Sequence, residues 1–138
     1  MVGIVIVSHG SLAQGLGEAA EMILGKQEYM TTLSLEPADG LDSLKAAIQL
    51  AAEQVNGGQG VLVLADVRGG TPCNAAALIA YNLELALVTG VNLPMLLEVL
   101  TRRRNIELAD LVEVAVMAGR EGIVDLSALM PRANSGSR

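Results

Sequence analysis

Two short runs of aliphatic residues constrain the fold of this chain more than any other feature. The first, Gly3-Ile4-Val5-Ile6-Val7, ends in Ser8-His9-Gly10-Ser11, and the second, residues 60–65, ends in Asp66 and a glycine-bearing loop. Uninterrupted β-branched and leucine residues are typical of strands buried on both faces, as in a parallel sheet covered by helices. Each run therefore predicts a central strand that turns into a helix.

The rest of the chain alternates between helix and strand patterns. Apolar residues at helical spacing predict helices over 12–24, 41–55, 71–81, 95–103 and 108–118. Further strands are expected over 30–36, 85–89 and, as a short last element, 123–126. This order predicts an α/β fold with a doubly wound, mainly parallel central sheet and helices on both faces. We expect one domain over residues 1–130 and a disordered polar tail over 131–138.

Two helix starts carry recognisable signals. Ser11 precedes the first helix and is expected to cap it, and Gly25 follows that helix as a typical end signal. Thr71 is expected at the N-cap of a later helix, with Pro72 at its first position.

The composition of the chain excludes several classes of partner and binding site. The chain of 138 residues lacks Phe and Trp and has a formal net charge of −6, which argues against nucleic acid as a partner. Cys73 is the single cysteine, so neither an internal disulfide nor a cysteine-based zinc site can form. The first apolar run lacks a basic leader, and no apolar stretch is long enough to span a bilayer. We therefore expect a cytoplasmic protein without direct membrane insertion.

Three turns follow predicted parallel strands, at His9-Gly10, residues 66–71 and residues 90–92. The carboxyl ends of such strands share one edge of the sheet, so these turns should converge. Asp66 could accept the proton of one imidazole nitrogen of His9 and leave the other nitrogen as a nucleophile. Backbone amides and helix N-termini nearby could hold an anion. A nucleophilic nitrogen beside an anion site favours a phosphohistidine.

The candidate site extends beyond this catalytic pair. The expected phosphate-binding residues are glycines and hydroxyl residues of the two turns, namely Gly10, Ser11, Gly69, Gly70 and Thr71. Arg68 and Asn92 are candidate contacts to the phosphate or to a partner, although a solvated loop charge also accounts for Arg68.

Other site patterns fit less well. Residues 15–20 match the dinucleotide pattern G-x-G-x-x-A, but they fall inside a predicted helix instead of a strand-to-helix turn. A serine hydrolase would need Ser8, Ser11 or Thr71 as its nucleophile, and the chain has no nucleophile elbow. One histidine and Asp66 are too few ligands for a metal site, so we expect neither a metal nor a cofactor.

The chain resembles the enzyme IIA domain of the mannose-type (mannose/fructose/sorbose) sugar phosphotransferase system. The resemblance covers about residues 2–126. It rests on four motifs in this order and spacing, which are Ile6-Val7-Ser8-His9-Gly10, residues 18–25, Asp66 with Gly69-Gly70-Thr71-Pro72 and Asn74-Ala75-Ala76, and residues 90–96.

The resemblance implies a phosphotransferase that works through a phosphohistidine at His9. This residue would accept phosphate from the phosphocarrier protein HPr and donate it to an enzyme IIB partner. Asp66 would orient His9, and the hydroxyl of Thr71 would lie near the phosphoryl group. The resemblance also implies a homodimer that can exchange a C-terminal strand, which would give residues 123–126 a partner.

Some features depart from the family pattern and leave alternatives open. Arg68 stands where the family usually has an apolar or aromatic residue, and Cys73 replaces a commoner large apolar one. The sequence also ends without the linker and IIB domain of some members, so we expect a separate IIA subunit or a component of a regulatory phosphorelay.

The phosphotransfer subunit of a dihydroxyacetone kinase is a second alternative. The Gly-Gly-Thr-Pro and Gly-Val-Asn-Leu-Pro turns argue against it.

Overall fold

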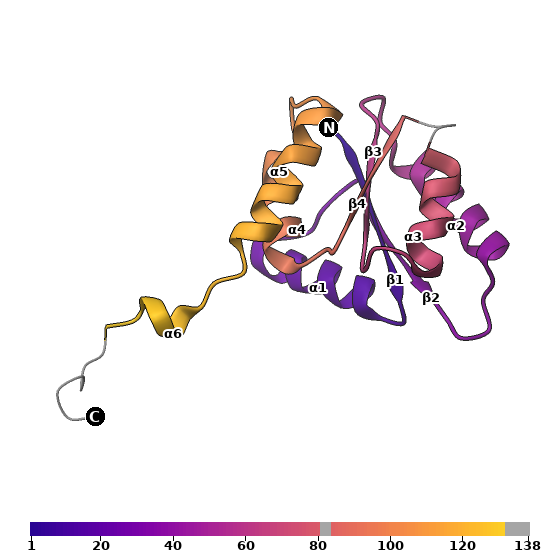
Figure 1. The fold of residues 1–138 in the computed structure, drawn as a ribbon. Helices are drawn as coiled ribbons and strands as arrows, with labels where there is room; N and C mark the ends of the chain where they lie inside the picture. The colour runs from indigo at the N-terminus through magenta and orange to yellow at the C-terminus, as the bar shows by residue number, and fades with distance from the viewer. Residues whose placement is uncertain (81–83, 132–138) are drawn as a thin grey trace.

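Four parallel strands form the central sheet of the computed structural model, which describes residues 1–80 and 84–131 (Figure 1). The spatial order is β2-β1-β3-β4, and the strands are β1 Gly3–His9, β2 Met30–Leu35, β3 Val61–Ala65 and β4 Leu85–Thr89. Val7 is paired with Ala65, and Ala65 with Thr89. The strands β1, β3 and β4 therefore end at the same edge of the sheet, as predicted.

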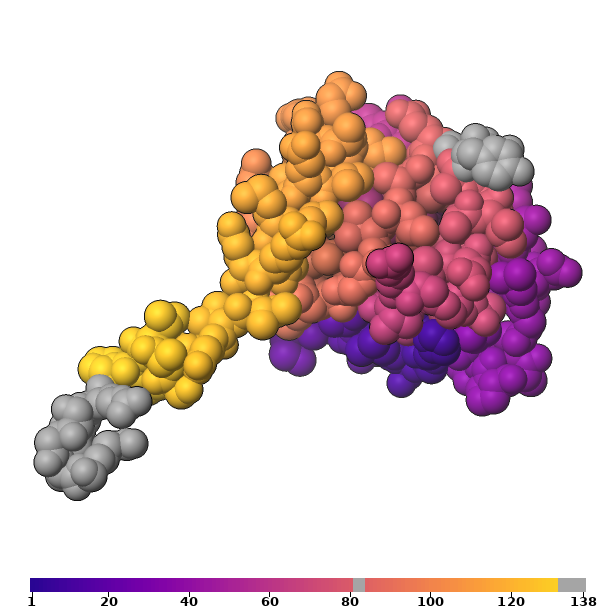
Figure 2. All heavy atoms as spheres, viewed as in Figure 1, coloured from indigo at the N-terminus to yellow at the C-terminus, as the bar shows by residue number. Residues whose placement is uncertain are grey.

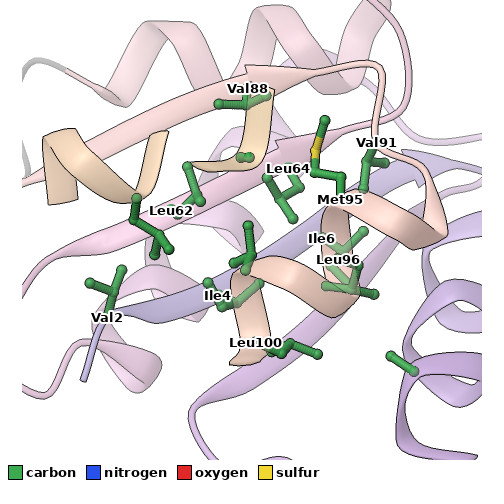
Figure 3. Close-up of a cluster of buried hydrophobic side chains, with 14 of the residues drawn as sticks. Val2, Ile4, Ile6, Leu62, Leu64, Val88, Val91, Met95, Leu96 and Leu100 are labelled. Atoms are coloured by element: carbon green, nitrogen blue, oxygen red, sulfur yellow. The ribbon is translucent and has the colours of Figure 1, made fainter. Parts of the chain in front are cut away.

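Helices cover both faces of this sheet (Figure 1). One face carries α1 Leu12–Leu24, α4 Leu93–Arg102 and α5 Leu108–Glu121, and the other carries α2 Leu41–Val55 and α3 Gly70–Ala80. Alternate residues of the central strands supply the two cores, so Ile4 and Ile6 face one helix layer while Val5 and Val7 face the other. Figure 3 shows the first core, where side chains of β1 and β3 meet α4. The predicted doubly wound α/β fold is confirmed.

Helix ends differ from the predictions by a few residues. α3 begins at Gly70, one residue before the expected N-cap, and the predicted end at Tyr81 lies outside the described residues. α4 begins at Leu93 instead of residue 95, because the side chain of Asn92 accepts a hydrogen bond from the backbone of Met95 at 2.9 Å. α5 runs three residues further than predicted, to Glu121.

The predicted final strand over 123–126 is wrong for this chain. Residues 123–125 form neither helix nor strand, and α6 (Leu126–Leu129) follows them. The segment extends away from the body of the protein (Figures 1 and 2), and among the described residues it is paired with no strand of the sheet. The side chain of Asp125 instead caps α6 by accepting a hydrogen bond from the Ala128 amide. Exchange of this segment between subunits stays a prediction.

Arg103 is buried near the amino-terminal edge of the sheet, at the end of α4, with 2% of its surface exposed. Its guanidinium donates hydrogen bonds to the carbonyl oxygens of Val2 and Tyr29 and to the side chain of Gln27. From the sequence, the arginines at 102–104 are expected to complement the dipole at a helix C-terminus, with docking of a partner as the alternative. The structure shows instead that this side chain joins α4 to the start of β1 and to the connection before β2.

Candidate functional site

His9 and Asp66 meet at the carboxyl edge of the sheet, at the ends of β1 and β3. Asp66 Oδ2 lies 2.7 Å from His9 Nδ1 and also accepts the backbone N–H of His9 at 2.9 Å. The other carboxylate oxygen accepts the backbone N–H of Val67 at 2.9 Å. The Asp66 side chain is only 7% exposed, whereas that of His9 is 52% exposed. A buried carboxylate thus orients an imidazole that a second molecule can reach.

The carboxylate also determines which nitrogen of His9 is reactive. Burial by itself would raise the pKa of Asp66, but hydrogen bonds from His9 and Val67 outweigh it and hold this pKa below its ordinary value. An ionised carboxylate can only accept hydrogen bonds, so His9 Nδ1 must carry the proton. Nε2 of the neutral ring then keeps a free electron pair.

Gly70 lies beside the edge of the ring that carries Nε2. A Cβ atom at this position would be 3.2 Å from His9 Cε1 and 3.6 Å from Nε2, and the backbone φ of Gly70 is +79°. Glycine therefore satisfies both the backbone conformation and the space next to the reactive nitrogen. The sequence predicts Gly70 in the site, and the structure places it against His9.

The start of α3 brings backbone amides to the same place. In the described part of the chain, no hydrogen bond from the N–H groups of Gly69, Gly70 or Thr71 is found. The first N–H groups of a helix have no partner within the helix and carry the positive end of its dipole. Thr71 lies in this first turn and is half-buried. The arrangement can stabilise a negative group attached to Nε2.

The turn that follows β1 differs from the prediction in its capping residue. Ser11 makes no capping hydrogen bond with its side chain. Ser8 takes that role, because its buried Oγ accepts the backbone N–H of Ala13 at 2.7 Å. Gly10 adopts a φ of +53°, and its N–H donates to the carbonyl oxygen of Leu35 at 2.8 Å. The amide of Gly10 is therefore already used within the fold.

Arg68 and Asn92, the two candidate contacts to the phosphate or to a partner, lie in different surroundings. Arg68 is exposed on the loop after β3, and among residues 1–80 and 84–131 no ion pair or hydrogen bond to its side chain is found. Asn92 accepts from Met95, as described above, and donates to the carbonyl oxygen of Gly119 at 3.0 Å. The side chain of Asn92 thus caps α4 and ties it to α5. An Asn two residues before a proline is a helix-start signal that could have predicted this cap.

The rival patterns have structural explanations. The G-x-G-x-x-A segment lies within α1, where a Cβ on Gly17 would be 3.1 Å from Thr32 Cγ2, so this glycine permits close packing of the helix on β2. Among the described residues, no three of His, Cys, Asp and Glu are grouped so that they could hold a metal ion. None of the helices in that part of the chain combines the length and apolar character of a membrane span.

Comparisons with known proteins agree on one family. Residues 3–116 match the family model described as "PTS system fructose IIA component". The chain is 38% identical over 129 residues to the mannose-specific EIIAB component of Escherichia coli K12, covering 92% of this chain and 40% of that protein. It is 35% identical over 113 residues to the fructose-specific EIIA component of Bacillus subtilis, covering 81% and 77% of the two chains.

A solved structure extends this agreement to three dimensions. The EIIA component of the Streptococcus agalactiae phosphotransferase system superimposes with a TM-score of 0.86 at 30% identity, covering 93% of this chain and 99% of that one. The family match spans far more than half of the sequence, and the fold agrees with it. The chain belongs to the mannose/fructose/sorbose family of phosphotransferase-system IIA components.

Proposed function

We propose that this protein is a cytoplasmic phosphocarrier that receives a phosphoryl group on His9 Nε2 from phospho-HPr and passes it to an enzyme IIB partner. The observation that carries this proposal is the 2.7 Å contact between His9 Nδ1 and a buried Asp66 carboxylate, which leaves Nε2 as the reactive nitrogen on an exposed ring. Membership of the phosphotransferase-system family supports the same role.

The transfer needs only a nucleophile and an orienting group. The electron pair of Nε2 attacks the phosphorus atom of the donor, and the bond from phosphorus to the donor breaks with its electrons left on the donor. A positive charge develops on the imidazole, and the Asp66 carboxylate stabilises it through Nδ1–H. The same steps in the opposite sense deliver the phosphoryl group to the acceptor, so neither a metal nor a cofactor enters the proposal.

The amides of Gly69, Gly70 and Thr71 and the Thr71 hydroxyl would hold the phosphoryl oxygens. These groups lie at the N-terminus of α3, next to the Nε2 edge of His9. The exposed Arg68 is an additional candidate contact for the phosphate or for a partner, and Ser11 remains a candidate on the opposite turn. The proposed functional form of the protein is a homodimer.

Intact-mass spectrometry tests this function. The protein is incubated with phosphoenolpyruvate, enzyme I and HPr, and the mass of the wild type is compared with that of His9→Ala. We expect one acid-labile phosphoryl group on the wild type and none on the variant. Addition of candidate IIB proteins should then remove the group from the wild type. Acid-labile phosphate on His9→Ala would show that another residue is the acceptor.

A further inference from the structure

Ser8 lies next to His9 but points to the opposite side of β1, into the protein. It is fully buried, with 0% of its surface exposed. Its Oγ accepts the N–H of Ala13 at 2.7 Å, which is a strong contact for a neutral pair, and donates a longer hydrogen bond to the carbonyl oxygen of Gly10 at 3.4 Å. One hydroxyl therefore contacts both the turn after His9 and the first turn of α1.

The orientation of the His9 ring depends on the backbone that this hydroxyl supports. The backbone N–H and the ring Nδ1 of His9 both use the same oxygen of Asp66, at 2.9 Å and 2.7 Å. Such a paired arrangement is possible only while the backbone at residue 9 stays close to β3. A shift of the turn would lengthen both hydrogen bonds and rotate Nε2 away from its place beside Gly70.

We propose that Ser8 is a positioning residue for the phosphotransfer reaction: its buried hydroxyl fixes the His9-Gly10 turn against α1 and so keeps Nδ1 on Asp66 and Nε2 open to the donor. This inference rests on the proposed function for its kinetic consequence. Its structural consequence, the proton position on His9, is independent of any phosphoryl donor.

Ser8→Ala is the first test, because it removes the hydroxyl with little change in volume. The fraction of neutral His9 with the proton on Nδ1 is measured by long-range ¹H–¹⁵N NMR, at a pH where the ring is uncharged. We expect this fraction to fall. The rate of phosphorylation by phospho-HPr should drop roughly 10-fold, as for other groups that hold a reactive side chain in position without contacting the substrate. Ser8→Thr keeps a hydroxyl at the same position and should restore both quantities toward the wild type.

Asn56→Ala is the matched control for lost turn hydrogen bonds. Asn56 Oδ1 accepts the N–H groups of Gly58 and Gly60 at 2.9 and 3.3 Å, in the turn before β3 at the other end of that strand. This control should lose stability but keep the wild-type proton position and rate. If Ser8→Ala behaves like Asn56→Ala in both readouts, Ser8 is a structural residue and the inference is wrong.

A failure of the variant to fold and a failure of the proposed function can be distinguished from each other. If Ser8→Ala does not fold, Ser8→Cys replaces it, since a thiol is a poor hydrogen-bond acceptor, and the same two readouts apply. If the wild type itself accepts no phosphate, the proposed function fails, while the proton position on His9 in the Ser8 variants still decides the role of this hydroxyl.

Discussion

Asp66 shows how one buried carboxylate can set both the position and the reactivity of a neighbouring side chain. Its Oδ2 atom accepts two hydrogen bonds from His9, one from the backbone and one from the ring. An asparagine could accept the backbone bond with its carbonyl oxygen, but it would carry no charge to stabilise the imidazole as it gains a phosphoryl group.

Asp66→Asn should therefore slow the phosphorylation of His9 by about 10- to 1000-fold while keeping the fold. The rate is measured by quenched-flow with phospho-HPr, and circular dichroism checks the fold. A wild-type rate in this variant would show that the carboxylate is only structural.

The same variant should respond differently to acid. Because the pKa of Asp66 is lower in the folded protein than in the unfolded chain, its ionised form stabilises the fold above the unfolded pKa. That contribution is lost as the pH falls from the ordinary carboxyl range through the folded pKa, which lies below it. Urea unfolding across this range should show a steeper loss of stability for the wild type than for Asp66→Asn, and parallel curves would contradict the expected pKa shift.

Gly70 and Gly69 form a matched pair for testing the space beside Nε2. Both have positive φ angles, +79° and +77°, so alanine at either position is strained by about 1–2 kcal/mol. A Cβ at Gly70 would contact the His9 ring, whereas one at Gly69 would meet no atom within 4 Å. Gly70→Ala should therefore slow phosphorylation of His9 much more than Gly69→Ala, at similar loss of stability. Equal rates in the two variants would indicate that Gly70 serves only the backbone.

At the scale of elements, the sequence predicts the sheet and the helix layers well. The runs before His9 and Asp66 are buried strands, and their ends bring these two residues together, as the parallel arrangement requires. The contacts that the sequence could not predict follow none of the familiar local patterns. Ser8 caps a helix from inside a strand, so its spacing to Ala13 matches no familiar capping pattern. Residues 123–126 have strand-like composition, but among the described residues they are paired with no strand of the sheet.

Arg103 is the most consequential of these unpredicted contacts for stability. Arg103→Met should lower the free energy of unfolding by about 2–4 kcal/mol, because it leaves the buried carbonyl oxygen of Val2 without its donor and removes three further hydrogen bonds to residues 27–29. Arg102 is a suitable control, since it is exposed and pairs with Glu98 at 3.5 Å on the surface. Arg102→Met should change the same free energy by less than about 1 kcal/mol in urea titrations. Similar losses in both variants would mean that the buried hydrogen bonds contribute little.

At the scale of the whole molecule, two apolar surfaces remain uncovered. The outer edge of β4 has no paired strand among the described residues, and a groove of about 420 Å³ runs beside it along α5. The segment after α5 extends away from the body (Figure 2) and exposes five large apolar side chains, Ile123, Val124, Leu126, Leu129 and Met130. An unpaired strand edge and an exposed apolar segment in one chain are suited to joining two copies by exchange.

We therefore predict a homodimer that depends on residues 123–130. In the dimer, this segment of one copy would lie along the unpaired edge of β4 of the other and pair with it. Light scattering should give a dimer mass for the full chain and for a chain truncated after Met130. Truncation after Gly122 should give a folded monomer, because it removes the apolar segment and leaves the sheet intact. A monomeric full chain would exclude the dimer, and a dimer that survives truncation after Gly122 would assign the contact to another surface.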